Sequence, residues 1–222
     1  MKPSILIARA IFPEVVERLR QHFDVEDNFA DDIFNAEQLA SRLKHKDGLL
    51  STLSERVDPH LLAACPRLKA VCNMAVGYNN IDVDAATRAG VMVTNTPDVL
   101  NETTADFGWA LLMAAARRIT EAEQWLRAGQ WQKWRYDSFV GADLPGSPLG
   151  LLGMGRIGQG IAKRGAHGFG MKVIYHNRSK LDAALEVECK ASYVSKEELL
   201  KSADHLVLVL PYSPASHHTI GE

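Results

Sequence analysis

The chain has 222 residues, of which 46% are hydrophobic and 23% charged, a composition typical of one or two soluble globular domains. Its formal net charge of −2 predicts that it binds neither nucleic acid nor a membrane, because no broad positive field would attract either one. The longest apolar stretch, residues 107–116, is too short to span a bilayer.

The first hundred residues alternate short apolar runs with amphipathic ones. Predicted strands lie at 4–8, 48–52, 70–74 and 91–95, with a weaker one around Val25. Predicted helices lie at 14–22, 36–44, 59–64 and 83–89, and Gly90 suits the position just after the last of them. This alternation predicts an α/β domain over residues 1–98, with helices covering a parallel sheet. The apolar run at 4–8 is interrupted by Arg9 and lacks a small-residue cleavage site, so we interpret it as a strand rather than a signal peptide.

One long helical pattern follows, over residues 101–128. Asn101 suits its N-cap, Glu102 and Asp106 suit the positive end of its dipole, and Gly129 suits its C-terminal end. A helix of this length in a domain of modest size usually bridges domains or pairs with a partner chain. The sequence therefore predicts one continuous helix with such a role.

A second alternation begins after an aromatic loop, rich in glycine and proline, at 130–148. Predicted strands lie at 149–152, 172–176 and 206–210, and predicted helices at 157–168 and 196–202, the latter capped by Ser195. Three strands in this order predict the first half of a second doubly wound parallel-sheet domain, over residues 99–222.

The stretch LGLLGMGRIGQG, residues 149–160, fits the pattern G-x-G-x-x-G between a strand and a helix. Gly153 would permit the tight turn, Gly155 would let the backbone approach a pyrophosphate, and Gly158 would let helix and strand pack closely. The helix N-terminus would offer N–H groups and a positive dipole end to the phosphates. This context predicts a dinucleotide site; the alternative is a glycine-rich turn that binds nothing.

The strand after this loop ends in YHNRS, residues 175–179, and indicates which dinucleotide binds. NAD-binding domains usually carry Asp or Glu about 20 residues after the glycines, where it holds the ribose hydroxyls. Here His176 or Asn177 takes that place, so no carboxylate repels a 2′-phosphate. Arg178 could bind the phosphate bidentately, with Asn177 and Ser179 as further donors. NADP(H) is therefore favoured over NAD(H); the alternative for Arg178 is a solvated surface arginine.

The chain resembles the D-isomer-specific 2-hydroxyacid dehydrogenase family, in particular its glyoxylate/hydroxypyruvate reductase and 2-ketogluconate reductase branch. The matching stretches, in the family's order, are AVGYNNID (75–82), NTPDVLNETTAD (95–106), LGLLGMGRIGQ (149–159), YHNRS (175–179) and LVLPYSPASHHTIG (208–221). The resemblance covers the whole chain. It implies a flavodoxin-like substrate domain followed by a Rossmann NAD(P)-binding domain, and a homodimer formed through the 101–128 helix.

The resemblance also assigns roles to individual residues. It implies that Val76 and Gly77 present backbone amides to the substrate carboxylate, although a simple turn could carry the same motif. Thr104 would lie near the nicotinamide, although a threonine in a first helical turn can also bond locally. The other implied cofactor contacts are Arg156, Ile157, Leu210, Pro211 and Ser213.

The implied reaction is NADP-dependent reduction of glyoxylate, hydroxypyruvate or 2-ketogluconate to the D-2-hydroxy acid. The family's catalytic Arg, Glu and His would all lie beyond residue 222, so we assign no catalytic residue and expect cofactor affinity at most from this chain. The resemblance gives His217 and His218 no catalytic role. An alternative function is a non-catalytic member of the same fold that senses nucleotides or binds a partner.

The three cysteines, Cys65, Cys72 and Cys189, have neither metal-ligand nor C-x-x-C spacing. They predict free thiols in a cytoplasmic protein, with no disulfide framework and no metal site.

Overall fold

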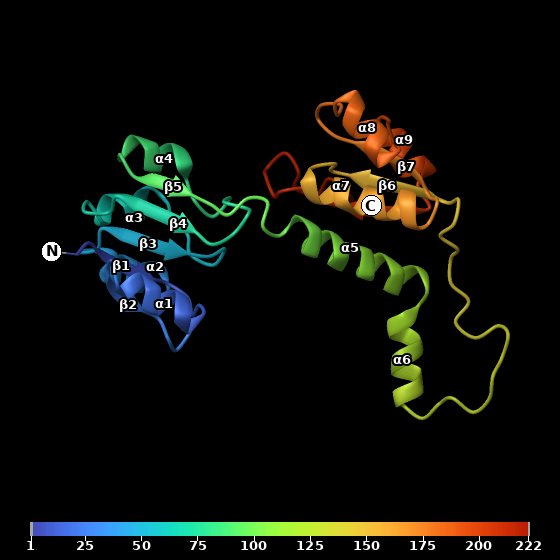
Figure 1. The fold of residues 1–222 in the computed structure, drawn as a ribbon, viewed down its shortest axis with the longest axis horizontal. Coiled ribbons are helices and arrows are strands. Elements are labelled where there is room, and N and C mark those ends of the chain that lie inside the picture. The colour runs from blue at the N-terminus through green and yellow to red at the C-terminus, as the bar shows by residue number, and fades with distance from the viewer. Residues whose placement is uncertain (1, 222) are drawn as a thin grey trace. The chain divides into compact units, whose positions relative to one another are not determined.

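The computed structural model describes residues 2–221 and has an α/β fold with two parallel sheets, as expected (Figure 1). The chain forms two compact units, which are described here separately. One unit runs to Asp98 and takes in the segment that begins at Pro211, and the other runs from Val99 to Leu210.

The first unit contains every strand and helix predicted for it, including the weak strand around Val25. Its strands are β1 (Ser4–Ile7), β2 (Asp24–Asp27), β3 (Gly48–Ser51), β4 (Ala70–Asn73) and β5 (Met92–Thr94). Its helices are α1 (Pro13–Arg20), α2 (Ala36–Leu43), α3 (Pro59–Ala64) and α4 (Val83–Arg88). The sheet has the order β2-β1-β3-β4-β5, and all its pairs are parallel.

Alternation along the strands determines what covers each face of this sheet. Leu6, Leu49 and Val71 are buried in one cluster with apolar residues of α2, α3 and α4.

The chain order reverses between β1 and β3, so the loops after these strands meet at a topological switch point. In open α/β sheets ligands bind outside the carboxyl ends of the strands at such a point.

The second unit contains one strand and one helix in places where the sequence predicted neither, at 191–193 and 183–189. Its strands are β6 (Pro148–Leu152), β7 (Lys172–His176), β8 (Ala191–Tyr193) and β9 (His205–Leu208), in the order β8-β7-β6-β9, all parallel. Its helices are α5 (Asn101–Ala116), α6 (Ile119–Arg127), α7 (Arg156–Lys163), a π-helical turn η1 (Arg164–Gly168), α8 (Ala183–Cys189) and α9 (Lys196–Ser202). The prediction missed α8 and β8 because Lys190, with φ of 46°, makes the left-handed turn between them that glycine usually makes.

Glycines set the spacing of the layers in this unit. A Cβ on Gly150 would lie 2.6 Å from the Cβ of Ala203 beside α9, so β6 needs glycine on that face. A Cβ on Gly160 of α7 would lie 2.8 Å from the Cβ of Ala105 on α5. The first approach packs α9 closely on β6, and the second packs α7 closely on α5.

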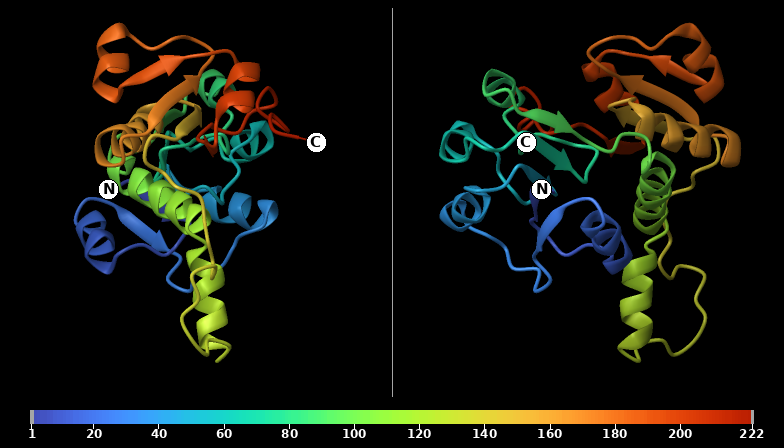
Figure 2. Two further views of the ribbon diagram at one scale, coloured as in Figure 1. Left: turned by 90° about the vertical axis from the view of Figure 1, so that its right-hand side faces the viewer. Right: turned by 60° about the vertical axis from the view of Figure 1, so that its left-hand side comes forward.

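The prediction of one helix over 101–128 is wrong. Arg118 has φ of 53°, which ends α5 and starts α6 in a new direction (Figure 2). The carbonyl of Ala116 accepts the N–H of Ala142 at 2.8 Å, so the returning loop replaces the next helical turn. The Arg118 guanidinium binds both carboxylate oxygens of Glu121 and lies 5.3 Å from the ring centroid of Phe139, which offsets the cost of the left-handed conformation. Asn101 is the first helical residue rather than the N-cap, which is Leu100.

Candidate dinucleotide and carboxylate sites

The three glycines of the G-x-G-x-x-G pattern differ in what surrounds their Cα atoms. Gly153 has φ of +103°, and a Cβ there would lie 2.1 Å from the carbonyl oxygen of Val209. A Cβ on Gly158 would lie 2.4 Å from the carbonyl oxygen of Gly153. At Gly155, by contrast, a Cβ would meet open space. Gly153 and Gly158 are therefore required by packing, whereas Gly155 leaves room for something outside the protein.

The N-terminus of α7 places a partial positive charge next to the open space at Gly155. Gly155 takes the N-cap position, and no side chain caps the helix end. The partial positive charge of a helix N-terminus favours a phosphate group, and an uncapped end leaves that charge available. The residues present therefore fit the pyrophosphate of a dinucleotide.

The end of β7 joins the glycine loop through Asn177. The Oδ1 atom of Asn177 accepts the N–H of Met154 at 2.7 Å, and the carbonyl of His176 accepts the N–H of Gly153 at 3.1 Å. The ring of His176 instead bonds through Nδ1 to the carbonyl of Val194 at 2.9 Å, on the β8 side. Of the two residues considered for the ribose-binding position, Asn177 is thus the one whose side chain adjoins the glycine loop.

Arg178 and Ser179 follow directly and are exposed. Arg178 forms no ion pair with any residue in the described range 2–221. An exposed guanidinium without an internal carboxylate partner is available to an external phosphate.

Tyr175, near the end of β7, connects this strand to the segment at 181–186 by hydrogen bonds. Its side chain is fully buried, its hydroxyl donates to Oε1 of Glu186 at 2.9 Å, and it accepts the N–H of Leu181 at 2.8 Å. Burial raises the pKa of Tyr175, and its hydrogen bond to Glu186 raises it further. Burial also raises the pKa of Glu186, but the hydrogen bonds from Tyr175 and Lys180 outweigh this and lower it overall.

The remaining cofactor candidates lie in different places. Thr104 and Ile157 line an apolar groove of about 520 Å³ between α5, α7 and β9. Arg156 is the exposed first residue of α7, and Leu210 lies two residues beyond β9. Pro211 and Ser213 belong to the segment that groups with the other unit, where the Ser213 N–H donates to Oγ of Ser216.

The candidate substrate residues lie in the first unit, in the loop between β4 and α4. Three consecutive carbonyls of this loop accept hydrogen bonds from the fold. The carbonyl of Ala75 accepts from the N–H of Thr96 at 3.0 Å, that of Val76 from Nδ2 of Asn95 at 2.9 Å, and that of Gly77 from Nδ2 of Asn73 at 2.8 Å.

The N–H groups that follow these carbonyls point the other way. In a trans peptide the N–H lies opposite the carbonyl, and the described chain contains no cis peptide. The N–H groups of Val76, Gly77 and Tyr78 donate to no acceptor within residues 2–221, and Gly77 and Tyr78 are exposed. Successive outward N–H groups form a concave site for an anion. Tyr78 was missed in the sequence, because its N–H is oriented by the hydrogen bond from Asn73 to the carbonyl of Gly77, and no motif indicates that bond.

Arg9 ties together three loops at the same edge of this sheet. Its guanidinium binds the carboxylate of Asp31 at 2.8 and 2.9 Å and donates to Oγ of Ser54 at 2.8 Å. The hydrogen bonds from Arg9 and from the N–H of Ala10 lower the pKa of Asp31 to about 2. The loops after β1, β2 and β3 are thereby held together, and Leu53 in the last of them would lie 3.9 Å from a Cβ on Gly77.

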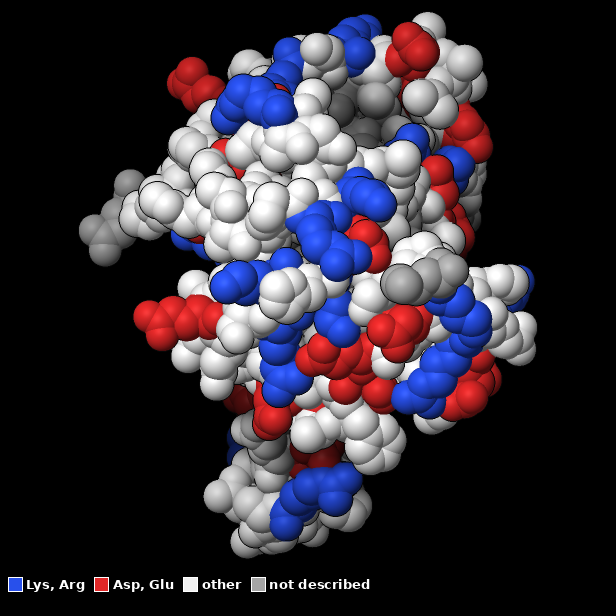
Figure 3. All heavy atoms as spheres, turned by 90° about the vertical axis from the view of Figure 1, so that its left-hand side faces the viewer, with Lys and Arg blue, Asp and Glu red and all other residues white. Residues whose placement is uncertain are grey.

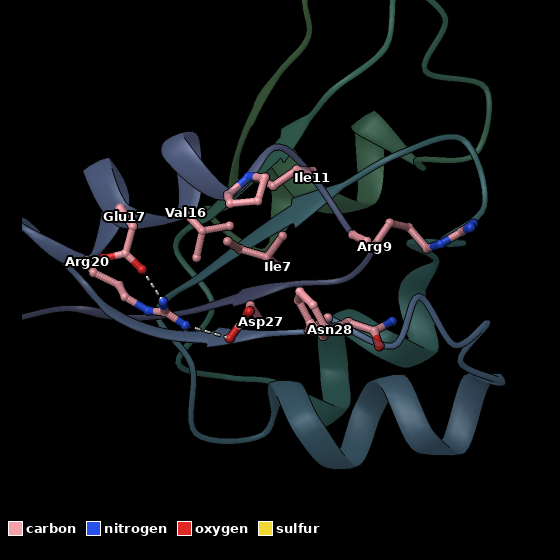
Figure 4. Close-up of a pocket in the computed structure, with 11 residues that line it drawn as sticks. Ile7, Arg9, Ile11, Val16, Glu17, Arg20, Asp27 and Asn28 are labelled. Atoms are coloured by element: carbon pink, nitrogen blue, oxygen red, sulfur yellow. Dashed lines mark hydrogen bonds and ion pairs between the residues drawn. The ribbon is translucent and has the colours of Figure 1, made fainter.

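A pocket of about 390 Å³ lies nearby, between α1 and the ends of β1 and β2 (Figure 4). Its charged groups already have partners, because Arg20 bonds to Glu17 and Asp27. The Nδ2 group of Asn28 donates to the carbonyls of Ala8 and Asp32. The polar side chains of this pocket are therefore already paired within the first unit.

Other kinds of site lack support in residues 2–221. This range contains no group of three or more His, Cys, Asp or Glu that could hold a metal ion. None of its helices combines the length and apolarity needed to cross a membrane. Positive and negative side chains are interleaved on the face shown in Figure 3.

Comparisons with known proteins agree with this geometry. Residues 109–222 match the model of the D-isomer specific 2-hydroxyacid dehydrogenase, NAD binding domain. The chain is 45% identical to a glyoxylate reductase of Thermococcus gammatolerans, over 100% of the chain and 67% of that protein. It is similar in structure to the TT0316 protein of Thermus thermophilus, with a TM-score of 0.87 and 37% identity over 97% of this chain and 67% of that one. A glyoxylate reductase from Paecilomyes thermophila has a TM-score of 0.85 and 31% identity, over 99% of this chain and 68% of that one.

Proposed function

Because the chain belongs to the D-isomer-specific 2-hydroxyacid dehydrogenase family of oxidoreductases, we propose that it supplies the cofactor and carboxylate sites of an NADP-dependent reductase of small 2-oxo acids. The observation that carries this proposal is the row of outward N–H groups at Val76, Gly77 and Tyr78. Two convergent amide donors suit one carboxylate, and a row of three suits a carboxylate with an adjacent 2-oxo group.

NADPH, when bound, supplies the hydride that reduces the 2-oxo carbon. The chain's own contribution is to bind and orient. The glycine loop and the start of α7 receive the pyrophosphate, and the amides at 76–78 hold the acid by its carboxylate. No residue of the described chain is assigned as the proton donor for the carbonyl oxygen.

The preference for NADPH over NADH rests on Asn177 and Arg178. Asn177 occupies the ribose-binding position with a neutral amide, and Arg178 is exposed without an internal ion pair. A 2′-phosphate there would meet a cation and no anion.

Glyoxylate is the preferred acid, since glyoxylate reductases are among the relatives; hydroxypyruvate and 2-ketogluconate are further candidates.

We also propose that the protein is a cytoplasmic homodimer. No residue of α6 is buried within the chain, and Leu126, Trp131 and Trp134 are exposed nearby. Such an apolar surface suits a second copy. The three cysteines are free thiols, which suits a reducing compartment. Light scattering during size exclusion should give twice the mass of one chain, and a monomer at micromolar concentration would contradict the proposal.

Binding measurements test the main proposal. Titration of NADPH and NADH followed by nucleotide fluorescence should give a lower Kd for NADPH, and oxalate, a non-reducible analogue of glyoxylate, should then bind to the complex. If neither nucleotide binds at millimolar concentration, the proposed function is wrong.

A further inference from the structure

Two asparagines, Asn73 and Asn95, donate hydrogen bonds to carbonyls of the loop whose N–H groups at 76–78 form the row described above, here called the amide row. We propose that Asn73 and Asn95 are positioning residues that make the N–H groups at 76–78 face the carboxylate of a 2-oxo acid. The inference rests on the proposed function and deepens it, because it explains what makes the loop a carboxylate site instead of a simple turn.

Asn73 is the last residue of β4, and its side chain is oriented from both ends. Its exposed fraction is 2%, and its Oδ1 accepts the hydroxyl of Ser51 on the neighbouring strand β3 at 3.0 Å. This leaves Nδ2 to donate to the carbonyl of Gly77 at 2.8 Å. The serine thus fixes which end of the amide faces the loop, and the amide fixes the peptide that joins Gly77 to Tyr78.

Asn95 does the same from the next strand. It follows β5 directly, and its Nδ2 donates to the carbonyl of Val76 at 2.9 Å. The N–H of its neighbour Thr96 holds the carbonyl of Ala75 at 3.0 Å. Two adjacent parallel strands therefore fix three consecutive peptide planes of one exposed loop.

The consequence follows from the polarity of a peptide. An unrestrained peptide plane in an exposed loop can rotate, which would exchange an N–H for a carbonyl oxygen on the outer side. A carbonyl oxygen facing a carboxylate repels it, so each asparagine both secures a donor and excludes an acceptor. Neither side chain needs to touch the acid.

The test follows individual amides by NMR in the ¹⁵N-labelled chain, with oxalate as the probe. In the unmodified chain the amide signals of Val76, Gly77 and Tyr78 should shift in a saturable way. In Asn95→Ala and in Asn73→Asp the Kd for oxalate should rise roughly fivefold to tenfold per lost hydrogen bond, and the shifts of Gly77 and Tyr78 should shrink. Asn95→Ala adds no charge, which separates loss of orientation from repulsion by a new carboxylate.

Asn28→Asp is the matched control. Asn28 is also buried in the first unit, with an exposed fraction of 7%, and its Nδ2 donates to two main-chain carbonyls, none of them in the 75–78 loop. This variant should bind oxalate with unchanged Kd even if its melting temperature falls. NADPH affinity should be unchanged in all three variants.

The outcomes separate the two ideas. If Gly77 and Tyr78 respond in the unmodified chain and both asparagine variants keep its Kd, the positioning role is overturned and the proposed function stands. If Asn28→Asp weakens binding as much as they do, general loosening explains the loss and the positioning role is again overturned. If NADPH binds but the three amides never respond to oxalate, the carboxylate site is wrong, and the inference falls with it.

Discussion

The side-chain oxygen of Asn177 accepts the main-chain N–H of Met154 at 2.7 Å, which links the end of β7 to the middle of the glycine loop. A carboxylate at this position could accept the same hydrogen bond. The amide therefore differs from an aspartate mainly in charge, and this difference can be tested without disturbing the loop.

Asn177→Asp should change the preferred cofactor. The new carboxylate keeps the bond to Met154, repels a 2′-phosphate and can accept from ribose hydroxyls, so the Kd ratio of NADPH to NADH should rise at least roughly tenfold. Fluorescence titration with both nucleotides measures the ratio. Arg178→Ala should weaken NADPH binding by a similar factor and leave NADH unchanged. Equal affinities for the two nucleotides, unaffected by Arg178→Ala, would sink the preference for NADPH.

Gly155→Ala and Gly158→Ala should separate ligand binding from folding. A methyl group at Gly155 meets open space, so the melting temperature should hardly change, while the nucleotide Kd rises by about tenfold or more because the backbone can no longer approach the pyrophosphate. At Gly158 a methyl group would lie 2.4 Å from the carbonyl oxygen of Gly153, so unfolding should be easier by about 1–3 kcal/mol. Calorimetry with and without NADPH distinguishes the two effects, and equal melting temperatures in both variants would contradict this account.

The ion pair between Arg9 and Asp31 should make the first unit sensitive to acid. The folded state holds the pKa of Asp31 at about 2, below its ordinary value of 3.8. A carboxyl with a lowered pKa stabilises the fold above its ordinary pKa, and this contribution is lost as the pH falls towards 2. Asp31→Asn should therefore lower the melting temperature by a few degrees at most at pH 7, because the pair lies at the surface, and the difference should vanish near pH 2. A difference that stays constant from pH 7 to pH 2 would show that the ion pair is not its cause.

Tyr175→Phe should destabilise the second unit. Removal of the hydroxyl leaves the N–H of Leu181 without its partner and the carboxylate of Glu186 with Lys180 alone, so the free energy of unfolding should fall by about 1–3 kcal/mol. Urea denaturation measures the change. Tyr193→Phe is a useful comparison, because that hydroxyl makes a longer bond of 3.3 Å, to the carbonyl of Asn177. A larger loss from Tyr193→Phe would reverse the assigned order.

Much of the fold was predictable from the sequence, since alternation of apolar runs reports burial directly. All five strands of the first unit were predicted, and so was Gly90 after α4, where φ is +70°. The family assignment is confirmed by the matching domain model and the relatives. The break at Arg118 and the turn at Lys190 were missed because both are non-glycine residues in left-handed conformations. The break at Arg118 depends on contacts with the later segment at 139–142, which a local pattern does not contain.

The candidate sites were predictable only in outline. The pattern of Gly153, Gly155 and Gly158 indicated three different spatial demands. The structure shows close backbone approaches at Gly153 and Gly158 and open space at Gly155, while binding of a dinucleotide stays a prediction. The loop at 75–82 was recognised by its motif, but no role was assigned to Asn73 or Asn95. Their role depends on which carbonyl each amide reaches across the sheet, and amphipathic periodicity carries no information about that.

The amide row also has a consequence for how the protein tolerates mutation. Its donors belong to the main chain, so replacing the side chain of Val76 or Tyr78 leaves the N–H groups in place. In a library of variants covering residues 73–96, the residues closest to the acid should therefore tolerate substitution better than residues that do not contact it. Substitutions in the loop that faces the acid would often be accepted, and the sensitive positions would be two asparagines, one buried and one partly buried, that never meet it. The exposed loop residues can therefore vary in sequence, while affinity for a carboxylate depends on Asn73 and Asn95 beneath them.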